Sequence, residues 1–165
     1  MKGGVRFLAA TGALLILGCS SPTTPRVPCM GGDVATWTAK GLNESAGSAV
    51  YWSDGGTFLI SFQDCNDQSE VTLSELPVPV AAGTYPLKYK PKHQDSPNGS
   101  AGGEYDVIGD TSYFTDANGS GSVVISSVDS SAKQFTGTFS FSGTDDTGTK
   151  TVDVSNGVLK KIDFE

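Results

Sequence analysis

The chain has one histidine, His93, and a serine-type catalytic triad would have to use it as its general base. His93 lies between Pro91 and Pro97, in a loop that enters a glycine-rich stretch. A triad needs its base held rigidly against the nucleophile and oriented by a third group. The sequence also lacks a G-x-S-x-G nucleophile elbow. We therefore interpret His93 as an exposed loop residue.

A second pattern with catalytic associations is Ser130-Ser131-Ala132-Lys133, which matches the S-x-x-K motif of penicillin-recognising enzymes. That chemistry places the motif on a helix, whereas here it falls between two predicted strands. The companion S-D-N and K-T-G motifs are absent from the sequence. We interpret the match as a coincidence in a serine-rich chain.

Acidic residues raise two further possibilities. Residues 116–121 imitate the start of a calcium loop, but the twelfth position, which needs a bidentate Glu, is Ser127. A β-turn at Asn118-Gly119 explains the same residues without an ion. A glycosidase needs only two carboxylates, and Glu104, Asp106 and Asp110 are close in sequence. A solvated strand face is the simpler interpretation, so we predict no catalytic residue, metal site or cofactor.

Three lysines at a spacing of two, Lys88, Lys90 and Lys92, would align on one face of a strand. A positive row on an acidic protein suits a carboxylated glycan, a lipid phosphate or an acidic partner. The alternative is an edge strand that lysines protect against aggregation. Together with Trp52, the lysines form a candidate ligand patch. Trp37 and Tyr51 could join Trp52 in a platform for sugar stacking, but the alternating strand around Trp37 favours a place in the core.

The remaining chemistry belongs to cysteine. Cys19 belongs to the N-terminal export signal described below, which leaves Cys29 and Cys65 as the remaining pair. In a protein expected to be exported, such a pair indicates a disulfide. A redox or metal thiol pair is the alternative, but the sequence has no C-x-x-C spacing. The predicted bridge ties the start of the domain to the loop at residues 64–67.

The apolar residues of the segments that would position these side chains recur at every second position. Phe58, Ile60 and Phe62 fall on one face of a strand, with Thr57, Leu59, Ser61 and Gln63 on the other. Residues 135–142 alternate between apolar or glycine and polar positions. This pattern predicts half-buried antiparallel strands. Further strands are expected at 34–40, 48–52, 70–74, 84–89, 104–108, 112–115, 121–127, 150–154 and 158–164. About ten short strands predict an all-β antiparallel sandwich or a small up-and-down β-barrel.

The last two of these strands are expected to form a hairpin. A three-residue loop, Ser155-Asn156-Gly157, with Gly157 in the left-handed conformation, would pair Val154 with Val158. This register would place Val152, Val154, Val158, Ile162 and Phe164 on one side.

The N-terminus has the form of an export signal. Basic Lys2 and Arg6 precede an apolar stretch at residues 7–17, which is too short to span a bilayer. The ending Ile16-Leu17-Gly18-Cys19 resembles the lipobox of bacterial lipoproteins. The resemblance implies cleavage before Cys19, acylation of this cysteine, and export to the outer membrane because Ser20 stands where inner-membrane lipoproteins often have aspartate. We thus expect a signal peptide at 1–18, a lipidated cysteine and disordered tether at 19–32, and one β domain at 33–165.

The C-terminal third also resembles a known group. Gly121-Ser122-Val123-Val124-Ile125, Gly137-Thr138-Phe139-Ser140-Phe141 and Asn156-Gly157-Val158-Leu159 are similar to segments of uncharacterised β-rich lipoproteins of the Bacteroidetes type. The resemblance implies a β domain on a lipid anchor and carries over no catalytic residue.

Charge limits the partners. The net charge is −7, and removal of Lys2 and Arg6 with the signal would make it −9. Nucleic acid is a poor partner for such a protein, because binding it depends on neutralising phosphates. We expect a non-catalytic binding or accessory module on the outer membrane, with a protein or glycan partner. The alternatives are a calycin-like carrier of a small apolar ligand and a carboxylate-based hydrolase.

Overall fold

Eleven antiparallel strands form the protein, as seen in a computed structural model that describes residue 29 and residues 32–54, 56–88, 101–115 and 121–164. The strands are β1 (Ala35–Ala39), β2 (Leu42–Ala46), β3 (Val50–Asp54), β4 (Thr57–Gln63), β5 (Ser69–Pro77), β6 (Gly83–Pro86), β7 (Gly102–Val107), β8 (Ser112–Phe114), β9 (Gly121–Asp129), β10 (Gln134–Asp145) and β11 (Thr151–Asp163). The predicted all-β antiparallel class is confirmed. In the described part of the chain, no helix has the length and hydropathy to cross a membrane.

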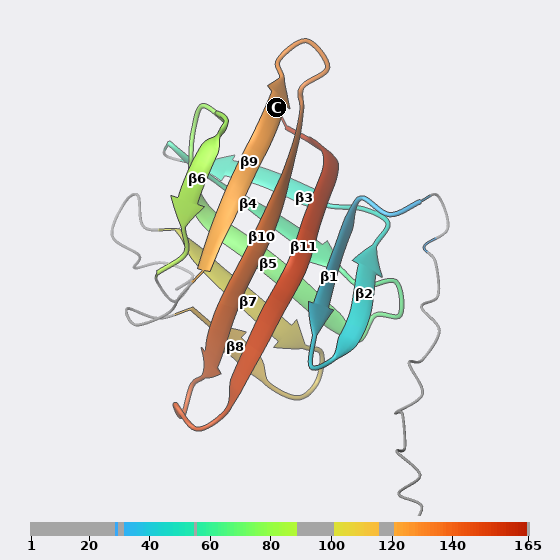
Figure 1. The fold of residues 1–165 in the computed structure, drawn as a ribbon, viewed down its shortest axis with the longest axis vertical. Coiled ribbons are helices and arrows are strands. Elements are labelled where there is room, and N and C mark those ends of the chain that lie inside the picture. The colour runs from blue at the N-terminus through green and yellow to red at the C-terminus, as the bar shows by residue number, and fades with distance from the viewer. Residues whose placement is uncertain (1–28, 30–31, 55, 89–100, 116–120, 165) are drawn as a thin grey trace, which may run out of the picture.

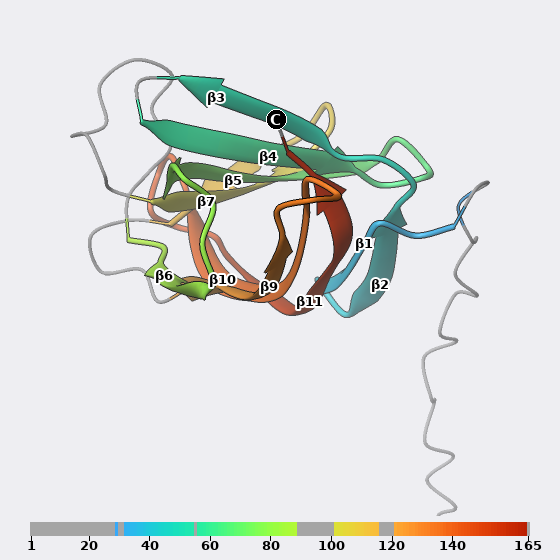
Figure 2. The same ribbon diagram turned by 90° about the horizontal axis from the view of Figure 1, so that it is seen from above.

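The strands belong to one curled sheet with two layers. Its main path runs in the order β2-β1-β11-β10-β8-β7-β5-β4-β3, and β9 pairs with both β10 and β6. Figure 1 shows the long strands β9, β10 and β11 crossing in front of β4, β5 and β7. Seen from above, β3, β4, β5 and β7 make one layer, while β6, β9, β10, β11 and β1 make the other (Figure 2).

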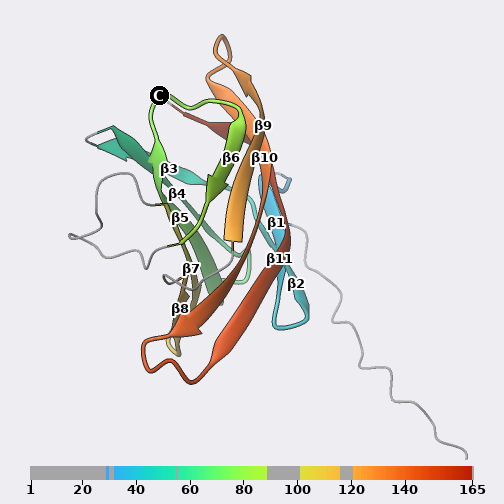
Figure 3. The ribbon, with the colours of Figure 1, turned by 60° about the vertical axis from the view of Figure 1, so that its left-hand side comes forward.

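Strand β10 joins the layers on one side. Its first part pairs with β9 and β11, and its last residues, Thr144 and Asp145, pair with Phe114 and Tyr113 of β8. Figure 3 shows β10 descending from the layer of β9 to the end of β8. A strand of 12 residues can reach from one layer to the other because it bends along its length.

The predicted hairpin at residues 155–157 is wrong, because β11 is one continuous strand of 13 residues. The register against β10 shifts between Val154 and Gly157 and again between Leu159 and Ile162, so each shift is a bulge. Asn156, rather than the predicted Gly157, has the positive φ, 53°. An Asn-Gly pair with a left-handed residue suits a bulge as well as a turn, and the pairing of β11 with both β1 and β10 selects the bulge.

The two bulges also change which side chains of β11 face the interior. Val152 and Val154 are buried, but beyond the first bulge the buried positions are Gly157 and Leu159, and beyond the second Ile162. Val158, which was predicted on the buried side, is half-exposed. Because a single extra residue reverses the faces of a strand, two bulges let one long strand stay packed while it curves.

The interior between the layers is filled mainly by aromatic rings. Phe62 of β4 contacts Trp37 of β1 and Phe139 of β10, with ring centroids 5.4 and 5.3 Å apart. Phe58 of β4 contacts Phe135 of β10 at 6.1 Å. All five side chains are at most 3% exposed. Each such pair adds about 0.5–1.5 kcal/mol beyond its buried area, so these contacts hold the layers together.

The layers are also joined where β2 approaches the turn between β4 and β5. The predicted disulfide between Cys29 and Cys65 is present, with Cα atoms 5.6 Å apart. The amide of Cys65 donates a hydrogen bond of 2.9 Å to the carbonyl of Ser45 in β2. The bridge therefore fixes the entry of the chain to the opposite layer.

Candidate functional site

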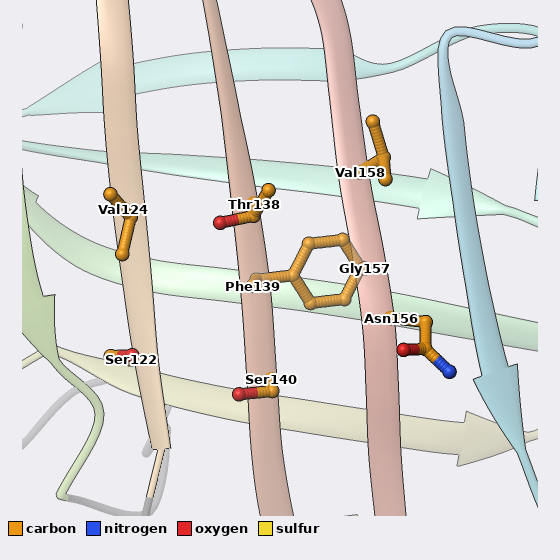
Figure 4. A pocket seen from close by; sticks show the side chains of 8 residues that line it. All are labelled: Ser122, Val124, Thr138, Phe139, Ser140, Asn156, Gly157 and Val158. Atoms are coloured by element: carbon orange, nitrogen blue, oxygen red, sulfur yellow. The ribbon is translucent and has the colours of Figure 1, made fainter.

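A shallow groove of about 440 Å³ lies on the outer face of β9, β10 and β11 (Figure 4). It is open to solvent along its length rather than enclosed. The side chains of Ser122, Val124, Thr138 and Ser140 lie on the outer face of the paired strands, whereas Phe139 and Gly157 are buried and close the groove from the core side. The lining residues are Ser122, Val124, Thr138, Phe139, Ser140, Asn156, Gly157 and Val158.

The floor of the groove depends on a close approach between β10 and β11. Phe139 and Gly157 are opposite residues in this pair, and the Phe139 ring lies across Gly157 (Figure 4). A Cβ on Gly157 would lie 2.6 Å from ring atoms of Phe139 and 2.4 Å from its carbonyl oxygen. Glycine is therefore required here, and the neighbouring bulge turns Asn156 outwards.

The chemistry of the groove is neutral. Hydroxyl groups of Ser122, Thr138 and Ser140 and the amide of Asn156 supply hydrogen-bond donors and acceptors, while Val124 and Val158 supply small apolar surfaces. None of its lining side chains titrates in the ordinary pH range. The groove can therefore bind a neutral, hydroxyl-bearing ligand, but its lining holds no general acid or base.

A separate polar cluster joins the two layers near the disulfide. Glu44 of β2 accepts hydrogen bonds from the Ser69 hydroxyl of β5 at 2.5 Å and from the Tyr105 hydroxyl of β7 at 2.9 Å. Burial raises the pKa of Glu44 above its ordinary value, although these two hydrogen bonds oppose the shift. Burial and the nearby Glu44 carboxylate also raise the pKa of Tyr105.

This polar cluster was not predicted. Glu44 is 25 residues from Ser69 and 61 from Tyr105, so no local spacing connects them. The Asp64 carboxylate, which also raises the pKa of Glu44, accepts hydrogen bonds from the amides of Gln68 and Ser69. The cluster holds the turn between β4 and β5 against β2.

The predicted ligand patch is described only in part. Trp52 is 59% exposed and Lys88 is exposed, whereas Lys90 and Lys92 lie outside the described residues. Lys88 directly follows Leu87 at the end of β6, and Figure 2 places β6 at the edge of one layer and β3, which carries Trp52, at the edge of the other. The patch as a binding site stays a prediction.

The three aromatic residues considered as a sugar platform lie in different environments. Trp37 is in the core, 2% exposed, as predicted. Tyr51 stacks on Phe58 with centroids 5.2 Å apart, and its neighbour Trp52 faces solvent on the other side of β3. The platform is therefore not formed, because adjacent residues of a strand point to opposite faces.

The acidic residues and the S-x-x-K match considered as catalytic groups lie in ordinary strands and turns. Glu104 and Asp106 lie on one face of β7, and Asp110 lies in the turn to β8. Residues 130–133 form the turn between β9 and β10, so the S-x-x-K match is not on a helix. Cys19, His93 and residues 116–120 lie outside the described residues. Within the described ranges, no three His, Cys, Asp or Glu side chains are grouped to hold a metal ion.

The fold and the groove define an all-β domain built on one curled antiparallel sheet, with a groove of neutral lining on its outer face. Residues 33–163 match a family described as "Domain of unknown function (DUF6252)", and this match includes all eleven strands. The chain belongs to that family. No curated protein and no solved structure matches the chain significantly.

Proposed function

We propose that this protein is a lipid-anchored, non-catalytic binding module of the bacterial outer membrane, and that its groove binds a neutral glycan. The observation that carries the binding role is the set of hydroxyl and amide groups that β9, β10 and β11 present in one groove. Strands hold such groups in fixed positions, and a preorganised site binds with less loss of conformational entropy.

The proposed ligand class follows from the lining. A sugar has hydroxyl groups that pair with those of Thr138 and Ser140, and C–H groups that pack on Val124 and Val158. A charged glycan would find no counter-charge among the lining residues. A neutral oligosaccharide therefore fits the groove better than an acidic one.

The filled interior favours this role over that of a carrier. A carrier of an apolar ligand needs space between its strands, and here the Phe62 ring contacts both Phe139 and Trp37 in that position. The groove, in contrast, is on the outside, where a large or polymeric ligand has access.

Binding is tested with the full chain on an array of neutral and carboxylated oligosaccharides. We expect at least one neutral oligosaccharide to bind, and the double variant Thr138→Ala/Ser140→Ala to bind it at least tenfold more weakly. Ser126→Ala is the matched control, because Ser126 lies on the outer face of β9 but outside the groove. Equal binding by the parent and the groove variant, or binding of carboxylated glycans alone, would contradict the proposal.

The anchor is tested separately by growing cells with an alkyne-bearing fatty acid. We expect the parent chain to take up the label and to separate with the outer membrane, since several acyl chains hold a protein stably. Cys19→Ala should lose both properties. Labelling that persists in Cys19→Ala, or an unlabelled parent chain recovered from the cytoplasm, would contradict the anchor.

A further inference from the structure

The layer of β3, β4, β5 and β7 has an outer surface that differs from the groove in both charge and hydropathy. We name it the β3 face and define it by Val50, Trp52, Leu59, Glu70, Glu75 and Asp106. It begins at β3, which ends the main path of the sheet (Figure 2). From there it continues across β4 and β5 to β7.

The β3 end of this face is apolar and exposed. Val50 is 64% exposed and Trp52 59% exposed, and both point outwards from the same strand. Trp52 lies opposite Leu59 of β4, which is half-exposed. A large aromatic side chain is seldom left so open on an edge strand, and such surfaces mark interaction sites.

The other end is acidic, and its carboxylates are held in place. Glu75 accepts a hydrogen bond of 3.1 Å from Thr57, and Glu70 accepts one from Ser61. Asp106 lies opposite Glu70 and accepts a hydrogen bond of 2.7 Å from Ser112. A hydroxyl donor orients a carboxylate without neutralising its charge, so the face keeps its negative potential.

The spacing of the strands defines what fits this face. Neighbouring strands are about 4.8 Å apart, and Glu70 pairs with Gln63, which is four residues along β4 from Leu59, the partner of Trp52. Glu70 and its partner Asp106 are therefore about 16–20 Å from Trp52. A ligand must therefore place apolar groups and positive groups at that separation. In an extended peptide, residues two apart on one face are about 7 Å apart, which gives this distance in about two to three steps.

We propose that the β3 face is the docking surface for a cationic polypeptide segment that places apolar side chains on Trp52 and basic side chains on Glu70 and Asp106. Charge complementarity selects this partner. A second copy of the chain, with its net charge of −7, would bring like charges to the same face. The proposal is independent of the groove, which lies on the opposite layer.

The test uses the full chain on a sensor surface and the synthetic peptide Leu-Ser-Leu-Ser-Lys-Ser-Lys. One extended face of this peptide carries both leucines and both lysines. Peptides with the lysines replaced by Glu, or the leucines by Ser, are the controls. We expect only the parent peptide to bind, and its binding to weaken as NaCl is raised from about 50 to about 500 mM.

Two variants locate the binding. Trp52→Ala and the pair Glu70→Gln/Asp106→Asn should each weaken the binding of the peptide at least tenfold. The matched control is Asp153→Asn/Asp163→Asn, which removes two charges from the other layer. Both of these carboxylates also accept side-chain hydrogen bonds, from Ser142 and Gln134 respectively.

Three outcomes would overturn the proposal. The first is unchanged binding in both β3-face variants. The second is an equal loss in the Asp153→Asn/Asp163→Asn control, which would show that only net charge matters. The third is self-association of the full chain that Trp52→Ala abolishes, with no binding of the peptide, which would assign the face to a second copy. Circular dichroism of each variant verifies that it is folded.

Discussion

Removal of the disulfide between Cys29 and Cys65 should cost a large part of the stability of this protein. The two cysteines are 36 residues apart in the sequence. In the chain-entropy model, opening a loop of this size lowers the free energy of unfolding by about 3.8 kcal/mol at 25 °C. Single domains are stable by about 5–15 kcal/mol, so the loss should be visible in any unfolding experiment.

The assay is urea unfolding of Cys65→Ala, Cys29→Ala and the double variant, all under reducing conditions, against the oxidised parent. Trp37 is buried and reports unfolding by its fluorescence. Cys65 is exposed, so Cys65→Ala removes the bridge with little loss of packing, whereas Cys29 is buried. The free energy of unfolding should therefore fall by a similar amount in all three variants, with a small additional loss where Cys29 is replaced.

Two results would refute this reasoning. A loss below about 1 kcal/mol in Cys65→Ala would show that the bridge does not stabilise the fold chiefly by restricting the unfolded chain. Losses in the two single variants that add up in the double variant would also refute it. Removing a second cysteine cannot break a bridge that is already open, so independent packing would then account for the effect.

Other perturbations test individual contacts. Burial raises the folded-state pKa of Glu44 from its ordinary value of 4.5. The contribution of Glu44 to stability is therefore fully present below pH 4.5 and is lost as the pH rises through the raised pKa. Glu44→Gln should therefore show a flatter dependence of unfolding free energy on pH, and an unchanged slope would contradict the pKa shift. Gly157→Ala should cost about 1–3 kcal/mol because its methyl group would lie 2.4 Å from the Phe139 carbonyl oxygen, whereas Gly83→Ala, with no atom closer than 3.5 Å, should cost little in the same urea titration. The Asp145 carboxyl, whose pKa is lowered to about 2 chiefly by the amide of Lys150, should titrate near that pH by NMR. Its contribution to stability is present above 3.8 and is lost as the pH falls towards 2, so a midpoint near 4 would contradict the hydrogen bonds.

The sequence predicts strands well where one face is apolar. Phe58, Ile60 and Phe62 alternate with more exposed residues in β4, and the same alternation continues through β10. β2 was missed, because Leu42, Asn43 and Glu44 have no apolar face and the strand depends on pairing with β1. The all-β class followed from local pattern, but the order of strands did not.

The bulges and the sites depend on contacts that local pattern does not contain. Asn156-Gly157 is compatible with a turn or a bulge, and only the neighbours β1 and β10 decide between them. The groove forms where the wet faces of three strands meet, and each face alone resembles ordinary solvent-exposed serine and threonine. The Cys29–Cys65 pair was predictable from the expectation that the chain is exported and Cys19 lipidated, because only two thiols then remain to pair.

The position of the disulfide has a mechanical consequence. A pull applied on the N-terminal side of Cys29 reaches the described strands through this residue, which is bonded to Cys65 between β4 and β5. Tension therefore passes into both layers at once, instead of peeling β1 away from β11 one hydrogen bond at a time. Reduction of this bond should lower the force needed to open the domain from its N-terminus, while leaving the force from the C-terminus almost unchanged.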